Sequence, residues 1–153
     1  MDTRPVAPAQ LHLTLHFLGN VPRARIPLLC SALRVPFQRH ELRFSRCELW
    51  PGGVLVAAPD AVPPALSDLR AAIGEALRGM GLPVEARAFR PHITLARRFT
   101  GPVPPALTKP LAWPVRRFAL VESGAASGGG YAVLRRYAGA SARLAENAAP
   151  LQG

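Results

Sequence analysis

Lysine and acidic residues are scarce in this sequence, although the chain is strongly basic. Its 153 residues include eighteen arginines, a single lysine and only nine acidic residues, which gives a formal net charge of +10. A charge of that sign attracts polyanions such as RNA or DNA. Abundant arginine with almost no lysine is also what a GC-rich genome produces, so the charge alone leaves a nucleic-acid partner undecided.

Cysteine and long apolar runs are scarce as well. Two cysteines, Cys30 and Cys47, do not make a disulfide framework and favour a reducing, cytoplasmic location. No apolar run reaches the ~18 residues of a transmembrane helix, and residues 1–10 lack the apolar core of a secretory signal. We therefore expect a cytoplasmic protein without a membrane partner. With 49% hydrophobic residues, the chain can bury the core of one compact domain.

The spacing of apolar residues predicts an α+β protein with a largely antiparallel sheet. Helical spacing covers residues 22–36 and the stretch that follows Pro63 and Pro64, where Gly79 ends the pattern. Strand patterns cover residues 11–18, 41–50, 53–59, 89–99, 115–123 and 131–137.

Two of the predicted strands carry the same pattern, His-x-Thr-Leu. It occurs in "LHLTLHFLG" with His12 and Thr14, and in "PHITLARRF" with His92 and Thr94. The two histidines lie 80 residues apart, about half the chain, which indicates an internally duplicated fold. A single His-x-Thr in a strand is common and means little, but two copies half a chain apart favour a functional pair.

Each motif presents one imidazole and one hydroxyl side by side, because residues i and i+2 of a strand share a face. If the two strands face each other across a cleft, two imidazoles flank one site. Such a set suits attack at phosphorus, where a neutral imidazole takes a proton from water and a protonated one gives a proton to the leaving oxygen. The hydroxyls, aided by an arginine, would hold the non-bridging phosphate oxygens.

A metal site is the competing use of these histidines. His12 and His16 share a strand face but stand four residues apart, or ~13 Å, which is too far for one zinc ion with bonds of ~2.0–2.1 Å. Neither a Cys-x-x-Cys nor a His-Glu-x-x-His pattern occurs. We therefore expect no metal and no other cofactor. We interpret His16 as a solvated or supporting residue, and His40, which lies between charged residues, as a surface residue.

The paired motifs resemble those of the 2H phosphoesterase superfamily, which is named for them. Within it the chain looks most like the RNA 2′,3′-cyclic phosphodiesterases, historically called 2′-5′ RNA ligases. The likeness is carried by "APAQLHLTLHFLGNV", "FRPHITLARR", "ELWPGGVLVAAPD" and "FALVESGAASGGGYAVLRRY". It implies a bilobal, pseudo-twofold α+β fold with antiparallel sheets flanking a central cleft and helices on the outside. We expect this domain over residues 1–137 and a flexible tail over residues 138–153.

The resemblance also implies metal-independent opening of a 2′,3′-cyclic phosphate at an RNA end, which leaves a 2′-phosphomonoester. By motif, His12 and His92 would be the acid–base pair, with Thr14 and Thr94 on the phosphate. We assign His92 to activating water and His12 to protonating the departing O3′, and the reverse assignment stays open. Arg97, which follows the second motif, would be a further phosphate ligand.

The strand pattern leaves the direction of Arg97 open. By strict alternation Arg97 shares a face with Ile93 and Leu95, whereas Arg98 shares a face with His92. Either a β-bulge re-aims Arg97, or its long side chain reaches around the strand edge. We keep Arg97 as the expected ligand.

Members of the family usually begin with an extra strand and helix before the first motif, which this sequence does not include. The missing strand would leave a sheet edge and an apolar surface exposed. We expect a homodimer through that edge, strand swapping or a less stable lobe. Adding a plausible upstream segment should then raise the melting temperature.

Two other functions remain compatible with the residues. The first is an RNA- or nucleotide-binding module that no longer catalyses, and the second is 2′-5′ RNA ligation, the reverse chemistry, which needs the same side chains. Further arginines are candidates for a surface that guides RNA, although any one of them is more often a solvated charge: Arg87, Arg90, Arg116, Arg117, Arg135 and Arg136.

Overall fold

The computed structural model describes residues 2–124 and 130–141, and the elements within them form two compact units. The first unit comprises Met1–Leu15, Leu42–Val62 and Arg87–Trp113, and the second comprises His16–Glu41, Pro63–Ala86 and Pro114–Gly153. The described residues give an α+β protein in which every strand pair of assigned direction is antiparallel. The expected fold class is thus confirmed.

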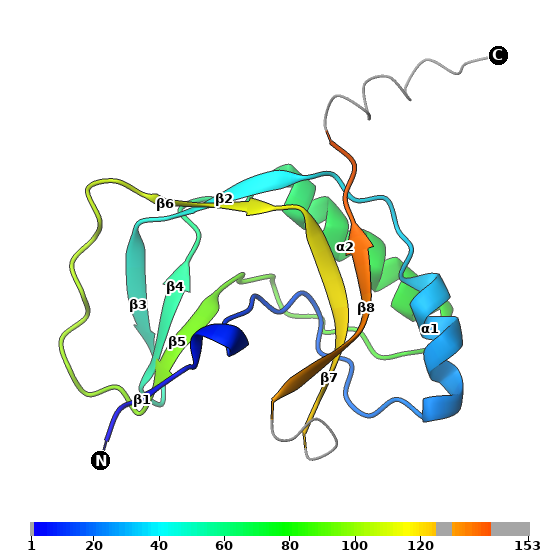
Figure 1. Ribbon diagram of the computed structural model, residues 1–153, viewed down its shortest axis with the longest axis horizontal. Helices are drawn as coiled ribbons and strands as arrows, with labels where there is room; N and C mark the ends of the chain where they lie inside the picture. Colours follow the sequence, from blue (N-terminus) through cyan, green and yellow to red (C-terminus); the bar gives the residue numbers. More distant parts are fainter. Residues whose placement is uncertain (1, 125–129, 142–153) are drawn as a thin grey trace. The chain divides into compact units, whose positions relative to one another are not determined.

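The first unit is built on a four-stranded sheet (Figure 1). Its strand order is β1-β5-β4-β3, and the bounds are Arg4–Pro5 for β1, Arg46–Trp50 for β3, Val54–Ala58 for β4 and Ile93–Arg97 for β5. A short 3₁₀ helix, η1 (Pro8–Gln10), follows β1.

The turn between β3 and β4 requires glycine for two reasons. Gly52 and Gly53 both have positive φ, 83° and 72°, where other residues are strained. The carbonyl of Gly53 also accepts a hydrogen bond from the backbone N–H of Phe99 at 2.9 Å, and a Cβ at this position would lie 3.2 Å from that nitrogen. The strand predicted over residues 53–59 is thus confirmed as β4, which pairs with β3 in an antiparallel hairpin.

The predicted strand over residues 41–50 is in fact two strands. β2 (His40–Phe44) pairs with β6 (Leu111–Val115), whereas β3 belongs to the four-stranded sheet. The break falls at Ser45, whose backbone N–H and hydroxyl both donate to Asp60 Oδ1, at 3.1 and 2.6 Å. The apolar alternation over residues 41–50 is continuous, so it gives no sign of the bend at Ser45, which is stabilised by the carboxylate of Asp60. The sequence did not predict β6, which contains Pro114.

The second unit contains the two α-helices of the described chain, α1 (Ile26–Ala32) and α2 (Pro64–Gly79), with a 3₁₀ turn, η2 (Arg23–Arg25), before α1. Both predicted helices are confirmed, and neither is long and apolar enough to cross a membrane. In α2 an apolar stripe is buried, with Leu66, Leu69, Ile73 and Leu77 no more than 4% exposed.

The end of α2 is a Schellman motif. Gly81 takes the left-handed conformation, with φ of 71°, and its N–H donates to the Arg78 carbonyl at 2.9 Å. The next N–H, of Leu82, donates to the Leu77 carbonyl at 3.0 Å, so two orphan carbonyls of the last turn are satisfied.

The hairpin of the second unit comprises β7 (Arg117–Ser123) and β8 (Tyr131–Ala138), as predicted. The Tyr137 ring stacks on Phe118 with centroids 4.7 Å apart, and its buried hydroxyl donates to the Cys30 carbonyl at 2.7 Å. Chain pairing continues past the predicted domain end at residue 137, because Ala140 bridges Gln38. The remainder of the predicted tail, residues 142–153, lies outside the described residues, as do residues 125–129 between the two strands.

His40 is half-buried, with part of its ring turned inward, whereas the sequence interpretation placed it on the surface. Its ring packs edge-on against Phe37 at 5.8 Å between centroids, and its Nε2 atom is buried. The alternation of β2 contains the reason, because His40 shares a strand face with the buried residues Leu42 and Phe44. The charged neighbours that suggested a surface position face the other way.

Residues 11–18 do not form the predicted strand. Their one recorded bridge joins Leu13 to Ile93 of β5, antiparallel. The same edge of β5 has already paired with β1, and the chain leaves that edge through η1 before it returns at Leu13. Alternation of apolar residues shows which face of a segment is buried. A strand also needs a neighbouring strand to hydrogen-bond with, and here β1 already occupies part of the β5 edge that residues 11–18 would need.

Candidate active site

The five site residues predicted from the sequence all belong to the first unit. Thr94 and Arg97 lie on β5, and His92 immediately precedes that strand. His12 and Thr14 flank Leu13, the residue that bridges β5. The sequence predicted two segments on facing walls, whereas the structure makes them neighbours along one sheet edge.

The bridge brings the two motifs together in a crossed arrangement. Antiparallel pairing of Leu13 with Ile93 runs the segments in opposite directions, so His12 comes opposite Thr94 and Thr14 comes opposite His92. These four side chains lie on the face opposite to that of the two bridging residues, since alternate residues project to opposite faces. Each histidine therefore has as neighbours the threonine of its own motif and the threonine of the other.

An apolar row supports this arrangement from behind. Cys47 of β3 pairs with Ala57 of β4, Ala57 pairs with Ile93 of β5, and Ile93 bridges Leu13. The central residues of both motifs are thus the last two members of a row that crosses the sheet. Burial raises the pKa of the Cys47 thiol, which favours the neutral, apolar form of this side chain.

Both imidazoles are oriented by the same backbone bond. His12 Nδ1 lies 2.7 Å from the Gln10 carbonyl oxygen, and His92 Nδ1 lies 2.8 Å from that of Arg90. A carbonyl only accepts, so Nδ1 carries the proton in each bond and Nε2 is the nitrogen that can exchange a proton with substrate. His40 makes the same bond to the Gln38 carbonyl at 3.0 Å, so the bond orients a histidine without marking it as catalytic.

The hydroxyls of Thr14 and Thr94 have no hydrogen-bond partner within residues 2–124 and 130–141. Thr14 is exposed and Thr94 is half-buried. A hydroxyl can donate one hydrogen bond and accept two, so both groups can bind a ligand without first breaking a protein contact. Two such donors beside two imidazoles suit a tetrahedral anion.

A β-bulge decides which way Arg97 faces. Val56 of β4 pairs with Thr94, but the preceding Leu55 pairs with Ala96, so one residue of β5 is extra. Leu55 and Val56 point to opposite faces, and their partners therefore do so too. Arg97 follows Ala96 and comes to the Thr94 face, which resolves the alternative that the sequence left open.

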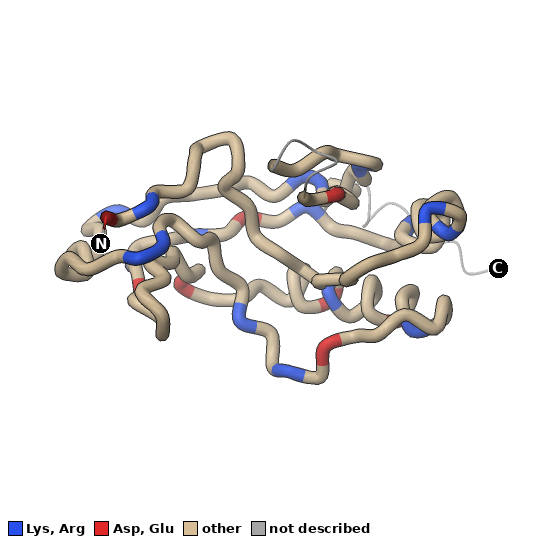
Figure 2. Tube along the Cα trace, turned by 90° about the horizontal axis from the view of Figure 1, so that it is seen from below, with Lys and Arg blue, Asp and Glu red and all other residues tan. Residues whose placement is uncertain are grey.

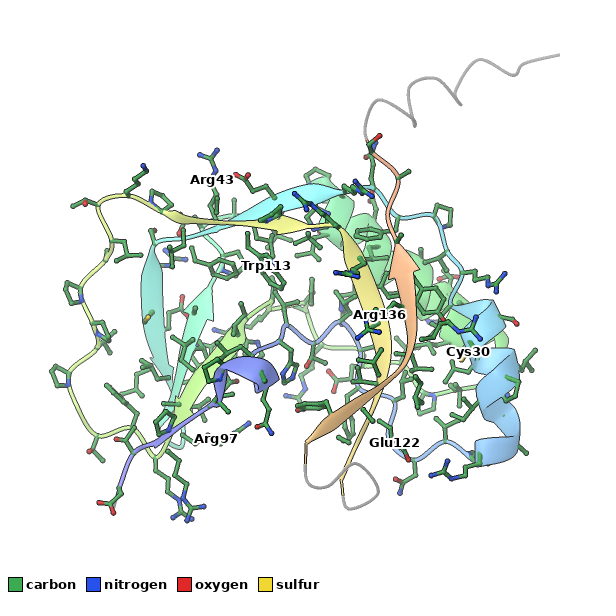
Figure 3. The ribbon with its side chains drawn as sticks, in the orientation of Figure 1. Cys30, Arg43, Arg97, Trp113, Glu122 and Arg136 are labelled. Atoms are coloured by element: carbon green, nitrogen blue, oxygen red, sulfur yellow. The ribbon has the colours of Figure 1, made fainter. Side chains whose placement is uncertain are left out.

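Arg97 also has a basic neighbour across the strand pair. Its register partner on β1 is Arg4, and directly opposed residues share a face about 4.5–5.5 Å apart at Cβ. Figure 3 shows Arg97 where β5 ends beside β1. Neither guanidinium has an ion-pair partner among the residues that the structure describes. Two like charges in this register repel each other, and an anion placed near both would offset that repulsion.

The first unit as a whole favours anions. Its residues include eight basic and three acidic side chains. Figure 2 shows how few acidic positions interrupt the basic ones along the trace. Two of the three carboxylates are occupied, Asp60 by Ser45 and Glu48 by Arg46, Arg90 and Trp50. The neighbourhood of the motifs thus presents little exposed negative charge to an incoming phosphate.

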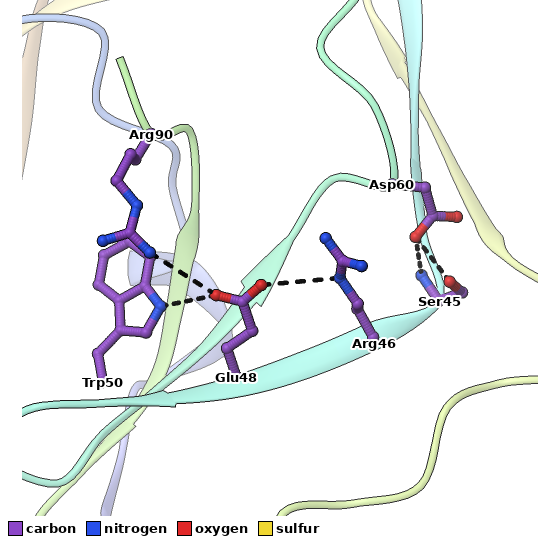
Figure 4. Close-up of polar contacts among 6 residues, drawn as sticks. All are labelled: Ser45, Arg46, Glu48, Trp50, Asp60 and Arg90. Atoms are coloured by element: carbon purple, nitrogen blue, oxygen red, sulfur yellow. Dashed lines mark hydrogen bonds and ion pairs between the residues drawn. The ribbon is translucent and has the colours of Figure 1, made fainter. Parts of the chain in front are cut away.

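Sequence reasoning missed the aromatic neighbour of His92. The indole of Trp50, at the end of β3, lies 4.3 Å from the His92 ring between centroids, with the planes inclined at 52°. Arg90 covers the indole with its guanidinium 4.4 Å from the centroid. Figure 4 shows Arg90 and Trp50 meeting at Glu48. Trp50 lies in one of the stretches that resemble the family, "ELWPGGVLVAAPD", but no pattern in the sequence indicates that it contacts His92.

His16 is a structural residue of the second unit. Its Nε2 lies 2.8 Å from the Arg70 carbonyl of α2, and the ring lies against Gly74, where a Cβ would be 3.6 Å away. These contacts to α2 agree with a supporting role for His16, and they do not involve the four residues of the paired motifs. Among the described residues no group of three or more His, Cys, Asp or Glu could hold a metal ion.

A comparison with models of known protein families shows which family the chain belongs to. The model described as "2′-5′ RNA ligase superfamily" matches residues 2–126, most of the sequence. The chain belongs to the 2′-5′ RNA ligase superfamily. Its members are known as 2H phosphoesterases, so the resemblance drawn from the two motifs is confirmed.

Relatives and solved structures within the superfamily agree with this assignment. An RNA 2′,3′-cyclic phosphodiesterase of Thermus thermophilus is 37% identical over an alignment of 134 residues, and the match covers 78% of this chain and 67% of that protein. One of Geobacillus stearothermophilus is 32% identical over an alignment of 106 residues, and the match covers 61% of this chain but only 32% of the relative. The structure of Escherichia coli LigT complexed with 3′-AMP has a TM-score of 0.77 and 29% identity, covering 89% of this chain and 80% of LigT.

Proposed function

We propose that this protein hydrolyses 2′,3′-cyclic phosphodiester ends of RNA to 2′-phosphomonoesters, without a metal ion, by acid–base catalysis with two histidines. The observation that carries the proposal is the antiparallel bridge between Leu13 and Ile93, which sets the two motifs in crossed register. The names of the two relatives support the same reaction for this chain. The cysteine usage of the sequence favours the cytoplasm as the place of action.

The crossed arrangement suits each step of the reaction. His92 Nε2 accepts a proton from water, and the water oxygen forms a new bond to phosphorus. The bond between phosphorus and O3′ breaks, and protonated His12 gives its proton to O3′, so the phosphate remains on O2′. Thr14 and Thr94 donate to the non-bridging oxygens, and Arg97 balances the charge that develops there.

RNA is the substrate class that the site fits best. Hydrolysis of a cyclic phosphate end of RNA leaves a phosphate on a ribose. The LigT structure named above contains a ribonucleotide of this kind, 3′-AMP. The basic first unit adds attraction for a longer polyanion, which predicts that affinity for an oligonucleotide falls with added salt. A homodimer through an exposed sheet edge remains part of the proposal, and sedimentation of the purified chain measures it.

The test is a turnover assay on an oligonucleotide that ends in a 2′,3′-cyclic phosphate, run in excess EDTA. We expect a 2′-phosphomonoester, identified by its resistance to an enzyme that removes only 3′-phosphates. His12→Ala and His92→Ala should each abolish most of the activity, while His16→Gln, the matched control, keeps an N–H donor for α2 and should leave the rate near that of the wild type. Turnover that survives either alanine variant would overturn the two-histidine mechanism.

The same assay separates the other functions. Binding of the cyclic phosphate end without product would identify a binding module rather than an enzyme. A joined product in the presence of a second oligonucleotide with a free 5′-hydroxyl would identify ligation.

A further inference from the structure

We propose that Trp50 is a positioning residue for His92, and that Glu48 and Arg90 hold the indole in the orientation this requires. The inference rests on the proposed function, in which His92 exchanges a proton with water. It deepens that function by assigning a role to a cluster in the first unit to which the paired motifs give no clue.

The His92 ring is fixed at two places. At one side, Nδ1 donates to the Arg90 carbonyl at 2.8 Å. A single hydrogen bond restrains one atom of the ring, but it still permits the ring plane to rotate about that contact. The Trp50 indole lies 4.3 Å from the ring centroid and blocks this rotation on one side. Together the two contacts define where Nε2 points.

The indole is in turn held from two directions. Its Nε1–H donates to Glu48 Oε2 at 2.8 Å, which fixes the rotation of the indole about its own stem. The Arg90 guanidinium lies 4.4 Å from the indole centroid, in range for a cation–π contact, and its Nη2 is 4.0 Å from the same Glu48 oxygen. Arg46 faces the other carboxylate oxygen at 3.7 Å.

Arg90 couples the two halves of this cluster. Its carbonyl binds the imidazole of His92, and its guanidinium covers the neighbour of that imidazole, Trp50. Arg90 and His92 lie two residues apart just before β5, and the side chains of both contact the Trp50 indole. The cluster therefore ties β3 to the residues that lead into β5, although β4 lies between these two strands.

Positioning should affect the chemical step more than binding. A catalytic group displaced by about 1 Å can cost about 100-fold in rate, whereas the phosphate contacts of the threonines and Arg97 are unchanged. We expect Trp50→Ala to lower kcat by about 10- to 100-fold with KM almost unchanged. Trp50→Phe retains an aromatic face for His92 and should recover most of the loss.

Trp113 supplies the matched control. It is the only other tryptophan of the sequence, it also belongs to the first unit, and its ring lies against Phe44 at 6.2 Å between centroids. Trp113→Ala removes a partly exposed indole outside the cluster, so its kcat should stay near that of the wild type. Circular dichroism of each variant establishes that it is folded, and Trp50→Leu replaces Trp50→Ala where the alanine variant fails to fold.

A second readout does not depend on activity. In Trp113→Phe protein, Trp50 is the only indole that emits, and its emission reports its immediate neighbours. Replacing His92 by alanine in that background removes the ring that touches Trp50 and should shift the emission maximum or intensity. Replacing His16 by glutamine should leave the emission as it was.

The outcomes are distinct. Loss of kcat in Trp50→Ala with recovery in Trp50→Phe, together with an emission change on His92→Ala, supports the positioning role. An active wild type whose Trp50→Ala and Trp113→Ala variants have equal kcat overturns the positioning role and leaves the proposed function intact. An inactive wild type overturns the proposed function itself, and unchanged Trp50 emission on His92→Ala shows that the two rings do not touch in solution.

Discussion

The two His-x-Thr segments share one sequence pattern, but the fold holds them to different degrees. Residues 93–97 form β5, which pairs with β4 along one edge and with β1 along the other. The segment 11–18 meets the sheet at one recorded bridge, between Leu13 and Ile93. Identical local patterns can therefore take different local structures, because a strand is made by its partners as much as by its own residues. The second segment is the fixed half of the site, and the first depends on it.

The largest effect is expected from removing the imidazole of either segment. His12→Ala and His92→Ala should each lower kcat by about 10²- to 10⁴-fold, the usual contribution of a general acid or base. A base must be neutral and an acid protonated, so loss of the base should remove the acidic limb of the pH–rate profile, and loss of the acid its alkaline limb.

We expect His92→Ala to lose the acidic limb and His12→Ala the alkaline one, measured as residual kcat across the neutral range. The opposite pattern would reverse the two roles. Both limbs persisting in either variant would contradict the acid–base pair.

Removing the hydroxyls tests whether the crossed arrangement makes the two segments equivalent. Thr14→Val and Thr94→Val keep the side-chain shape, and each should lower kcat/KM by about 10- to 100-fold, or about 1–3 kcal/mol. Thr14→Ser and Thr94→Ser retain the hydroxyl and serve as controls. A large loss at Thr94 with none at Thr14 would mean that the loosely held segment does not contact the phosphate.

Arg97 and its neighbour test the bulge of β5. Arg97→Ala should raise KM by about 10-fold or more, because a charge-assisted hydrogen bond contributes about 1.5–3 kcal/mol. Arg98→Ala is the control, since Arg98 lies just past the end of β5 with a positive φ of 54°, outside the register that brings Arg97 to the Thr94 face, and its KM should change little. Steady-state kinetics on one oligonucleotide measures both, and equal effects would show that the bulge does not select between the two arginines.

Hydrogen exchange sharpens the comparison without any substitution. Backbone amides of residues 11–18 should exchange faster than those of residues 93–97, because only the latter have ladder partners on both sides. Mass spectrometry of proteolytic peptides measures this, with and without inorganic phosphate. Phosphate should slow exchange mainly in the first segment. Equal exchange rates in the two segments would rule out the difference in restraint.

Cys47, which begins the apolar row that ends at Ile93 and Leu13, should make stability depend slightly on pH. Burial raises the pKa of Cys47 above its ordinary value of 9.0, so the unfolded chain releases this proton more readily than the folded one. Stability should therefore fall as pH rises through this ordinary value, and Cys47→Ala should lessen that fall. Denaturant titrations at neutral and alkaline pH measure the difference, and identical alkaline losses in both proteins would exclude Cys47 as a source.

Elements defined by local patterns were predictable from the sequence. The apolar stripe of α2, its start at a proline and its end before a left-handed glycine all lie within one stretch of chain. The β3–β4 hairpin follows from two consecutive glycines in the same way. The four residues of the paired motifs could be named because the pattern repeats, and the bulge at Arg97 could be posed as an alternative because the alternation there conflicted with the motif.

Features that depend on distant partners were not predictable. The break at Ser45 is held by Asp60, and the reach of the first motif segment is limited by β1, which occupies the same edge of β5. The contact of Trp50 with His92 joins two strands that are not adjacent in the sheet. No local spacing encodes such contacts, because they arise from sheet order and register.

The bridge between Leu13 and Ile93 has a consequence for the origin of the site. It pairs equivalent positions of two copies of one pattern in antiparallel register, which is the contact that a twofold axis makes between identical chains. A half-length ancestor with one copy would have had no working centre alone and a complete one on self-association. Because both copies lie in one chain, each can differ from the other, as the indole beside His92 and the bulge beside Thr94 do, whereas a symmetric pair of chains would carry such a change twice.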